Sequence, residues 1–290
     1  MKIKSVLYYF WSGAILLSLI LVLFALLFVS FRKSSDDGSQ ISDTVVSDSP
    51  QGPADGSGSQ TEISEITEAT PEVSAEPTAR PNNGLSSPAK LPESEDAGQE
   101  YLDKWYFLGD STTYGLSAYG CVESKRVWTG VSGTLTLPNW SFTNIKDYET
   151  GTEMSLTDIC AAKKPEYLLI TLGVNGVSFL GEEDFKATYV AMVEAIQAAT
   201  PDTKIVLGSI FPVAASYGHL DQINNTKITA ANSWILSIAE DMDLRYLDVN
   251  AYLRGADGNL PESYQSGDGM HLTPAAYQIV LDCVRTHVYE

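Results

Sequence analysis

The sequence predicts a three-layer α/β/α domain on a five-stranded, mainly parallel sheet, and three observations carry this prediction. From residue 99 onward, short apolar runs bounded by turn residues alternate with longer segments of helical period. The apolar runs are nearly continuous, which is typical of parallel strands covered by helices on both faces. The segment 99–290 also has the length of one such domain.

The individual elements follow from the same pattern. Strands are expected at 104–110, 126–133, 166–173, 203–211 and 244–249. Helices are expected at 154–163, 182–199, 224–242 and 273–288. The helical period is clear in 182–199, where Phe185, Tyr189, Met192 and Ile196 recur at steps of three and four residues.

The connection 134–154 is longer than a plain strand-to-helix link, so we expect a small hairpin or flap there. With this segment, Trp128, Trp140 and Tyr148 are candidate walls of a substrate site, and Trp128 is the one we assign to substrate binding. The alternative is that each is an ordinary packing aromatic.

The first 33 residues predict an N-terminal signal anchor. No charged residue occurs from Ser5 to Phe31, and a helix needs about 20 apolar residues to cross a bilayer. No A-x-A triplet follows the run before Arg32, which favours an uncleaved anchor over a cleaved signal peptide. We expect one pass through the cell membrane at residues 5–31. Since basic residues flank both ends, the extracellular placement of the C-terminal domain depends on analogy with bacterial surface stalks.

Residues 34–98 predict a disordered, acidic, Ser/Thr/Pro-rich linker. They are almost free of aromatic residues, so they cannot bury enough apolar surface to offset the entropy of ordering. From Ser34 to Glu100 the chain has 14 acidic and 2 basic residues. The whole chain has a formal net charge of −19, which argues against a nucleic-acid partner.

The polar residues that follow the expected strands indicate where chemistry occurs. In an open parallel sheet, ligands bind beyond the carboxyl ends of the strands. Asp110 and Ser111 follow the first strand, Asn175 follows the third, and the segment 267–271 precedes the last helix. These three places are expected to meet at one edge of the sheet.

Ser111 is the candidate nucleophile, with a helix N-cap as the alternative. Its base must be one of three histidines. His271 follows Asp268 by three residues, so a short turn can bring the carboxylate to one ring nitrogen and leave the other for the serine. We expect His287 to be a surface residue near a helix end, and assign no role to His219.

Acyl transfer also needs donors for an oxyanion. The Ser111 backbone N–H, at a helix N-terminus, is one candidate, and the amide of Asn175 is another, with an Asx-turn as its alternative. Gly133 is the candidate backbone donor, and Gly130 or Gly151 could fill that role instead.

Together these residues resemble the SGNH hydrolases, also called GDSL-type esterases, across 104–290. The resemblance lies in four blocks that occur in the expected order: Gly109-Asp110-Ser111, Gly133 within GVSG, Gly173-x-Asn175, and Asp268-x-x-His271. It implies a flavodoxin-like fold and a membrane-anchored bacterial surface member of the family. It also implies no metal and no organic cofactor.

The resemblance implies a role for each block. Ser111 would be the nucleophile, His271 the general base and Asp268 its orienting carboxylate, while Gly133 and Asn175 would complete the oxyanion hole. The chain departs from the family pattern at Thr112, where the family has Leu, and at Gly176, where it often has Asp. That Asp usually supports its loop, so the second departure concerns the orientation of Asn175.

The predicted function is that of an extracytoplasmic serine esterase that hydrolyses or transfers small acyl esters. O-acetyl groups on cell-envelope glycans are the expected substrates, by resemblance and location. The alternative is a non-catalytic carbohydrate-binding or scaffolding domain on the same fold. The three cysteines (Cys121, Cys160 and Cys283) show no metal spacing and are expected to be buried apolar residues, with one disulfide as an open alternative.

Overall fold

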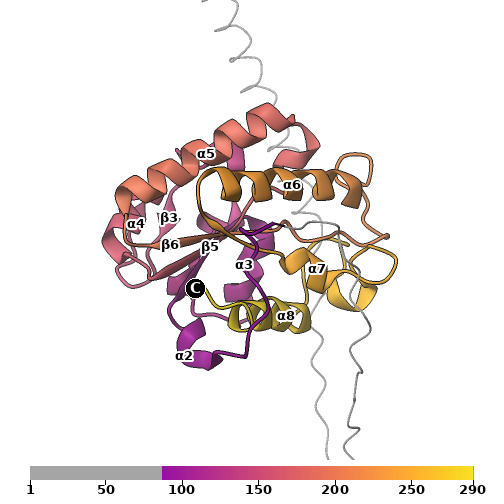
Figure 1. The fold of residues 1–290 in the computed structure, drawn as a ribbon, viewed down its shortest axis with the longest axis horizontal. Helices are drawn as coiled ribbons and strands as arrows, with labels where there is room; N and C mark the ends of the chain where they lie inside the picture. Colours follow the sequence, from indigo (N-terminus) through magenta and orange to yellow (C-terminus); the bar gives the residue numbers. More distant parts are fainter. Residues whose placement is uncertain (1–86, 290) are drawn as a thin grey trace, which may run out of the picture. The chain divides into compact units, whose positions relative to one another are not determined.

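A computed structural model of the chain describes residues 87–289, which form a three-layer α/β/α domain. Figure 1 shows one helical layer with α4, α5 and α6, and another with α2, α7 and α8. The predicted membrane span at 5–31 and most of the predicted linker lie outside the described residues. Within residues 87–289, no helix is both long and apolar enough for a bilayer crossing.

The central sheet has five parallel strands in the order β2-β1-β5-β6-β7. Their bounds are β1 Trp105–Gly109, β2 Val127–Trp128, β5 Tyr167–Thr171, β6 Lys204–Gly208 and β7 Arg245–Leu247. The chain passes from β1 to β2 on one side of β1 and then crosses back to β5 on the other side, so the strand order reverses at β1. Such a reversal is where open α/β sheets bind ligands.

Alternating residues of each strand supply two separate cores. In β1, Phe107 packs into the core on the side of α8, and Leu108 into the core on the side of α5. Leu169 and Ile170 divide in the same way in β5. Burial on both faces explains why the strands are nearly continuous apolar runs.

The helices confirm most of the periodic segments. Their bounds are α2 Gly98–Leu102, α3 Ser111–Ala118, α4 Leu156–Lys163, α5 Glu182–Ala199, α6 Asn225–Asp241, α7 Val249–Leu253 and α8 Pro274–Arg285. The prediction for α5 matches residue for residue. The short helices α2, α3 and α7 were not among the predicted helical segments, since five to eight residues show too few turns for a clear period.

The second predicted strand, 126–133, is wrong in extent. Only Val127 and Trp128 pair with β1. The chain then turns at Gly130, where φ is +70°, and the N–H of Leu135 donates to Thr129 O at 2.9 Å. The predicted hairpin in 134–154 is present as β3 (Ile145–Lys146) and β4 (Glu153–Met154), which pair antiparallel.

The boundary predicted between linker and domain at 98/99 also needs correction, because residues 87–97 are bonded to the domain. The N–H of Leu91 donates to Tyr246 O at 2.9 Å, and Tyr246 N–H donates to Ala89 O at 2.8 Å, so this segment covers the β7 edge. Further along, Ala97 N–H donates to Arg285 O at 3.0 Å. Within residues 87–289, no disulfide joins any of Cys121, Cys160 and Cys283, so the structure does not support the disulfide alternative.

Candidate active site

Ser111 is the first residue of α3, directly beyond the end of β1. The N-cap is Asp110 rather than Ser111, since the Asp110 Oδ1 accepts hydrogen bonds from Thr112 N at 3.0 Å and from Thr112 Oγ1 at 2.7 Å. Capping by its neighbour leaves the Ser111 hydroxyl free for another partner. As the first helical residue, Ser111 also has a backbone N–H without an intrahelical acceptor.

The partner of the Ser111 hydroxyl is His271. Ser111 Oγ lies 2.9 Å from His271 Nε2, and His271 Nδ1 lies 2.5 Å from Asp268 Oδ2. With its proton on Nδ1, the neutral imidazole donates to the carboxylate and accepts the serine proton at Nε2. The structure thus brings together the hydroxyl, imidazole and carboxylate in the order of a Ser-His-Asp triad.

The turn from Asp268 to His271 is held by its own carboxylate. Asp268 Oδ1 accepts hydrogen bonds from the backbone N–H groups of Met270 and His271, both at 2.9 Å. The turn is tied to the loop after β6 by Ala214 N–H, which donates to Gly269 O at 2.7 Å. This arrangement fixes the imidazole although the side chains of His271 and Asp268 are 36% and 52% exposed.

The charge state of Asp268 follows from the same contacts. Partial burial on its own raises the pKa of this carboxyl, but hydrogen bonds from the His271 ring and from two backbone N–H groups outweigh it. The net result is a pKa below the ordinary aspartate value, so Asp268 is ionised at neutral pH. An ionised carboxylate at Nδ1 would stabilise an imidazolium if the His271 ring took the proton of Ser111.

Gly133 lies against the nucleophile. Its φ is +74°, and a Cβ atom built there would stand 3.1 Å from Ser111 Cα and 3.3 Å from Tyr114 Cβ. Only glycine combines this backbone conformation with such a close approach. Its N–H makes one long hydrogen bond, 3.4 Å to Gly130 O, within the short 3-10 helix Val131–Gly133.

Asn175 lies in the loop beyond β5, and a buried side chain ties this loop to the nucleophile. Asp110 Oδ2 accepts a hydrogen bond from Gly173 N at 3.4 Å, while Oδ1 of the same carboxylate caps α3. Asn175 O accepts from Ser178 Oγ at 2.9 Å. In residues 87–289, no hydrogen-bond partner is recorded for the Asn175 side-chain amide, which leaves its N–H groups for a ligand.

The departure at Gly176 has a local explanation. The Gly176 N–H donates to Gly173 O at 2.8 Å, so the loop closes through its own backbone. A Cβ at Gly176 would lie 3.2 Å from Leu180 Cδ1, which leaves little room for a side chain. Backbone bonds and Asp110 therefore hold this loop, in place of the carboxylate that the family often has at position 176.

Asp110 is a site residue that the sequence pattern located but to which it assigned no role. It is 1% exposed, and burial raises the pKa of its carboxyl even though Thr112 and Gly173 donate hydrogen bonds to it. Its position immediately before Ser111 was visible in the sequence. What was not visible is that its second oxygen reaches the loop of Asn175, some 60 residues away in the chain.

Trp128 does not line the site, and its assignment to substrate binding is corrected. The side chain is 1% exposed and packs against Tyr106, with ring centroids 5.0 Å apart. Trp128 belongs to β2, so its indole fills one of the two cores. The alternative that it is an ordinary packing aromatic is the one that the structure supports.

The flap over the site is likewise not observed. The tip of the β3–β4 hairpin is bonded to the last residue of α4, because Lys163 Nζ lies 2.8 Å from Asp147 Oδ1 and 2.7 Å from Glu149 Oε2. Lys163 precedes the start of β5, whereas the site lies where β5 ends. Tyr148 is 49% exposed at this tip, near the end of the sheet where the strands begin.

The other histidines have different surroundings. His287 is buried rather than on the surface: its Nδ1 lies 2.8 Å from Cys283 O and its Nε2 lies 2.9 Å from Tyr252 Oη. His219 is exposed, and its ring meets Tyr217 edge-on with centroids 5.8 Å apart. In residues 87–289, no three His, Cys, Asp or Glu side chains are grouped as metal ligands.

Comparisons with known proteins place the chain in a family. A sequence model of the GDSL-like Lipase/Acylhydrolase family matches residues 107–279. No curated protein matches the chain. Solved structures do: a GDSL-like lipase from Bacteroides thetaiotaomicron is 19% identical, with 65% of this chain and 88% of that chain covered and a TM-score of 0.47.

Two further structures are similar. A carbohydrate esterase family 3 protein from Talaromyces cellulolyticus is 15% identical, with coverage of 62% and 93% and a TM-score of 0.41. The acetyl xylan esterase AlAXEase is 19% identical, with coverage of 64% and 99% and a TM-score of 0.44. The family match spans more than half of the chain, and the chain is a carboxylic ester hydrolase that belongs to the GDSL-like lipase/acylhydrolase family.

Proposed function

We propose that the protein is an extracytoplasmic serine esterase that removes small acyl groups, and that Ser111, His271 and Asp268 carry out the reaction. The observation that supports this most directly is the chain of contacts from Ser111 Oγ through His271 to Asp268, 2.9 Å and 2.5 Å long, at the switch point of the sheet. Family membership supports the ester bond as the target.

In the first half of the cycle, Ser111 Oγ attacks the ester carbonyl while His271 Nε2 takes the hydroxyl proton. The carbonyl oxygen becomes an oxyanion, which the N–H groups of Ser111, Gly133 and Asn175 stabilise. Collapse of the tetrahedral intermediate breaks the bond to the alcohol. His271 gives its proton to the departing oxygen, and the acyl group stays on Ser111.

In the second half, a water molecule gives a proton to His271 and attacks the acyl carbonyl. The acid leaves, and Ser111 recovers its proton from the imidazole. Transfer to a sugar hydroxyl is the same chemistry with another acceptor. Asp268 stays ionised throughout and stabilises the imidazolium in both halves of the cycle.

The substrates we propose are O-acetyl groups on cell-envelope glycans. The proposed location supports this: the uncharged run from Ser5 to Phe31 would anchor the chain in the cell membrane, and residues 34–86 would hold the domain outside. A tag at the C-terminus that is accessible to a non-permeant label on intact cells would support this orientation. Labelling only after lysis would contradict it.

The test of the activity compares the purified full chain with its Ser111→Ala variant on a short-chain aryl acetate. We expect the variant to lose at least about 10⁴-fold in kcat, since loss of the nucleophile removes the covalent step. Equal rates for the two proteins would overturn the esterase proposal and favour a binding domain. A series of aryl esters of increasing acyl length then tests whether the enzyme prefers acetate.

A further inference from the structure

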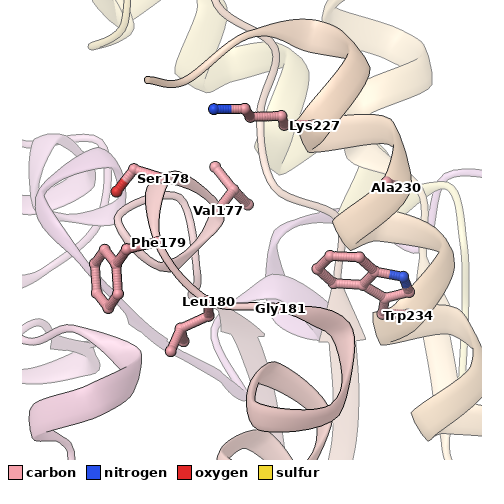
Figure 2. A pocket seen from close by; sticks show the side chains of 8 residues that line it. All are labelled: Val177, Ser178, Phe179, Leu180, Gly181, Lys227, Ala230 and Trp234. Atoms are coloured by element: carbon pink, nitrogen blue, oxygen red, sulfur yellow. The ribbon is translucent and has the colours of Figure 1, made fainter. Parts of the chain in front are cut away.

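A groove of about 350 Å³ lies between the loop that follows Asn175 and the outer face of α6. Figure 2 shows the side chains that line it, among them Ser178, Phe179, Leu180, Lys227 and Trp234. None of these residues belongs to the triad or to the oxyanion donors. Clefts of this size lined by aromatic groups and a few polar groups are typical ligand sites.

The groove is close to Asn175, the candidate oxyanion donor. Its first lining residue, Val177, is two positions from Asn175, so their Cα atoms are at most about 7.6 Å apart. The two places also share a support. Phe185 packs against Trp234 with ring centroids 5.5 Å apart, and it also contacts Gly173 at the start of the loop. A ligand in the groove can therefore be part of a molecule whose ester reaches Ser111.

The Trp234 side chain suits a sugar ring. It is half-buried with its ring toward the groove, whereas the ring of Phe179, which is 65% exposed, points away from Trp234 (Figure 2). The C–H faces of a pyranose are apolar and pack on flat aromatic rings, while its hydroxyls stay in contact with water or polar side chains.

Lys227 adds a positive charge. Its Nζ donates to the backbone carbonyls of Asp221 at 3.0 Å and Gln222 at 2.7 Å. These acceptors hold the ammonium in place without neutralising it, because carbonyls carry no net charge. An ammonium has three N–H donors, so one remains for a ligand. Although the chain has a formal net charge of −19, Lys227 gives the groove a local positive charge that attracts an anion.

We propose that the groove binds a carboxylate-bearing sugar of an acylated glycan, with the ring on Trp234 and the carboxylate on Lys227. The inference rests on the proposed function for the ester end of the same molecule. It makes these two residues specificity determinants for the glycan, while the triad acts on the acyl group.

The test measures binding separately from turnover. The full chain with Ser111→Ala is titrated calorimetrically with an O-acetylated oligogalacturonide and with its carboxyl-reduced counterpart. Lys227→Gln should weaken binding of the charged form by roughly tenfold and leave the reduced form unchanged, since it removes a hydrogen bond to a charged group. Trp234→Ala should weaken both forms.

Matched controls lie elsewhere on the domain. Lys125→Gln removes the same charge at a lysine paired with Glu123, and Tyr148→Ala removes an exposed ring at the hairpin tip. Groove variants that bind both glycans as these controls do would overturn the inference. Equal affinity of the unaltered groove for the charged and reduced forms would overturn it too.

Turnover of an aryl acetate by chains with Ser111 intact separates the two proposals. This small substrate does not reach the groove, so Lys227→Gln, at a side chain whose ammonium is bonded to the backbone carbonyls of Asp221 and Gln222, should match the unaltered chain in kcat/KM. If no ester is hydrolysed while the binding pattern holds, the proposed function fails and the groove inference stands. If the aryl acetate is hydrolysed and the groove variants bind both glycans normally, the groove inference fails and the proposed function stands.

Discussion

The carboxylates at the two ends of the parallel strands have different partners. Where the strands end, Asp110 accepts from Thr112 and Gly173, and Asp268 accepts from backbone N–H groups and an imidazole. At the hairpin tip, Asp147 is paired with Lys163 at 2.8 Å. The site carboxylates thus face groups that are neutral at rest. In the proposed mechanism, the charge of Asp268 is therefore still available to stabilise an imidazolium at His271. The Asp147 carboxylate, in contrast, is already paired with Lys163, and this ion pair attaches the hairpin to the end of α4.

The largest effect is expected at Asp268. Asp268→Asn should lower kcat for an aryl acetate by about 10⁴-fold, because an amide neither holds the imidazole in the required tautomer nor stabilises its charge. The melting temperature should change little, since this side chain is 52% exposed. Kinetics and thermal unfolding of the same preparation test both statements. A variant with near-normal kcat would show that the exposed turn is not part of the catalytic machinery.

The next effect is expected at Asn175, which contributes a dipole rather than a charge. Asn175→Ala should lower kcat by roughly 10²-fold, the usual loss of one oxyanion donor, with little change in KM. Steady-state kinetics on the aryl acetate separate the two constants. An increase in KM with unchanged kcat would mean that the amide binds the ground state instead.

A smaller effect is expected at Asp110, which acts through other residues. Asp110→Asn replaces one acceptor oxygen by an amide donor that faces either Gly173 N–H or the Thr112 donors. We expect kcat to fall roughly tenfold, corresponding to one lost hydrogen bond to a charged group of about 1.5 kcal/mol. KM should stay unchanged, because the acyl group does not touch Asp110. A raised KM would point to a substrate contact instead of positioning.

The smallest effect on activity is expected at Asp147, near the end of the sheet where the strands begin. Asp147→Asn should leave kcat/KM for the aryl acetate unchanged but lower the melting temperature at pH 7. The hydrogen bond from Lys163 is the main cause that lowers the pKa of Asp147 to about 2, against an ordinary value of 3.8.

The sign of the pH dependence follows from that shift. A carboxyl whose pKa is lower in the folded state stabilises the fold above its unfolded pKa, and this contribution is lost as the pH falls through the folded value. The difference in melting temperature between the two proteins should therefore be full at pH 7 and shrink between about pH 4 and pH 2. A difference that is independent of pH would exclude the ion pair as its cause.

Much of the fold was predictable because burial on both sheet faces leaves a strong pattern. The run around β5 and the period of α5 need no tertiary information to identify. The pattern failed for β2, where two paired residues are followed by a turn at Gly130 and a short 3-10 helix, Val131–Gly133. It also missed the strand-like pairing of residues 89–91. Their composition is that of the linker, and the pairing depends on hydrogen bonds to Tyr246, which is distant in the sequence.

The site divides in a similar way. The residue types and their order identified Ser111, Asp268 and His271, since a hydroxyl, a carboxylate and an imidazole that follow strand ends have a known chemical use. Trp128 could not be placed in this way. An aromatic residue can fill a core or face a ligand, and its 1% exposure depends on Tyr106 and its other neighbours in space.

By itself the sequence determined the alternation of elements, the edge of the sheet at which polar groups gather, and the residues that can react there. Those properties depend on the periodicity of short segments and on the chemical type of each residue, and neither requires knowledge of the tertiary structure. Only the tertiary structure decided that Asp110 joins two loops, that the hairpin tip turns away from the site, and that Lys227 and Trp234 lie across a groove from the loop that follows Asn175. These are contacts between residues far apart in the chain, and their distances are set by how the packed layers fit together.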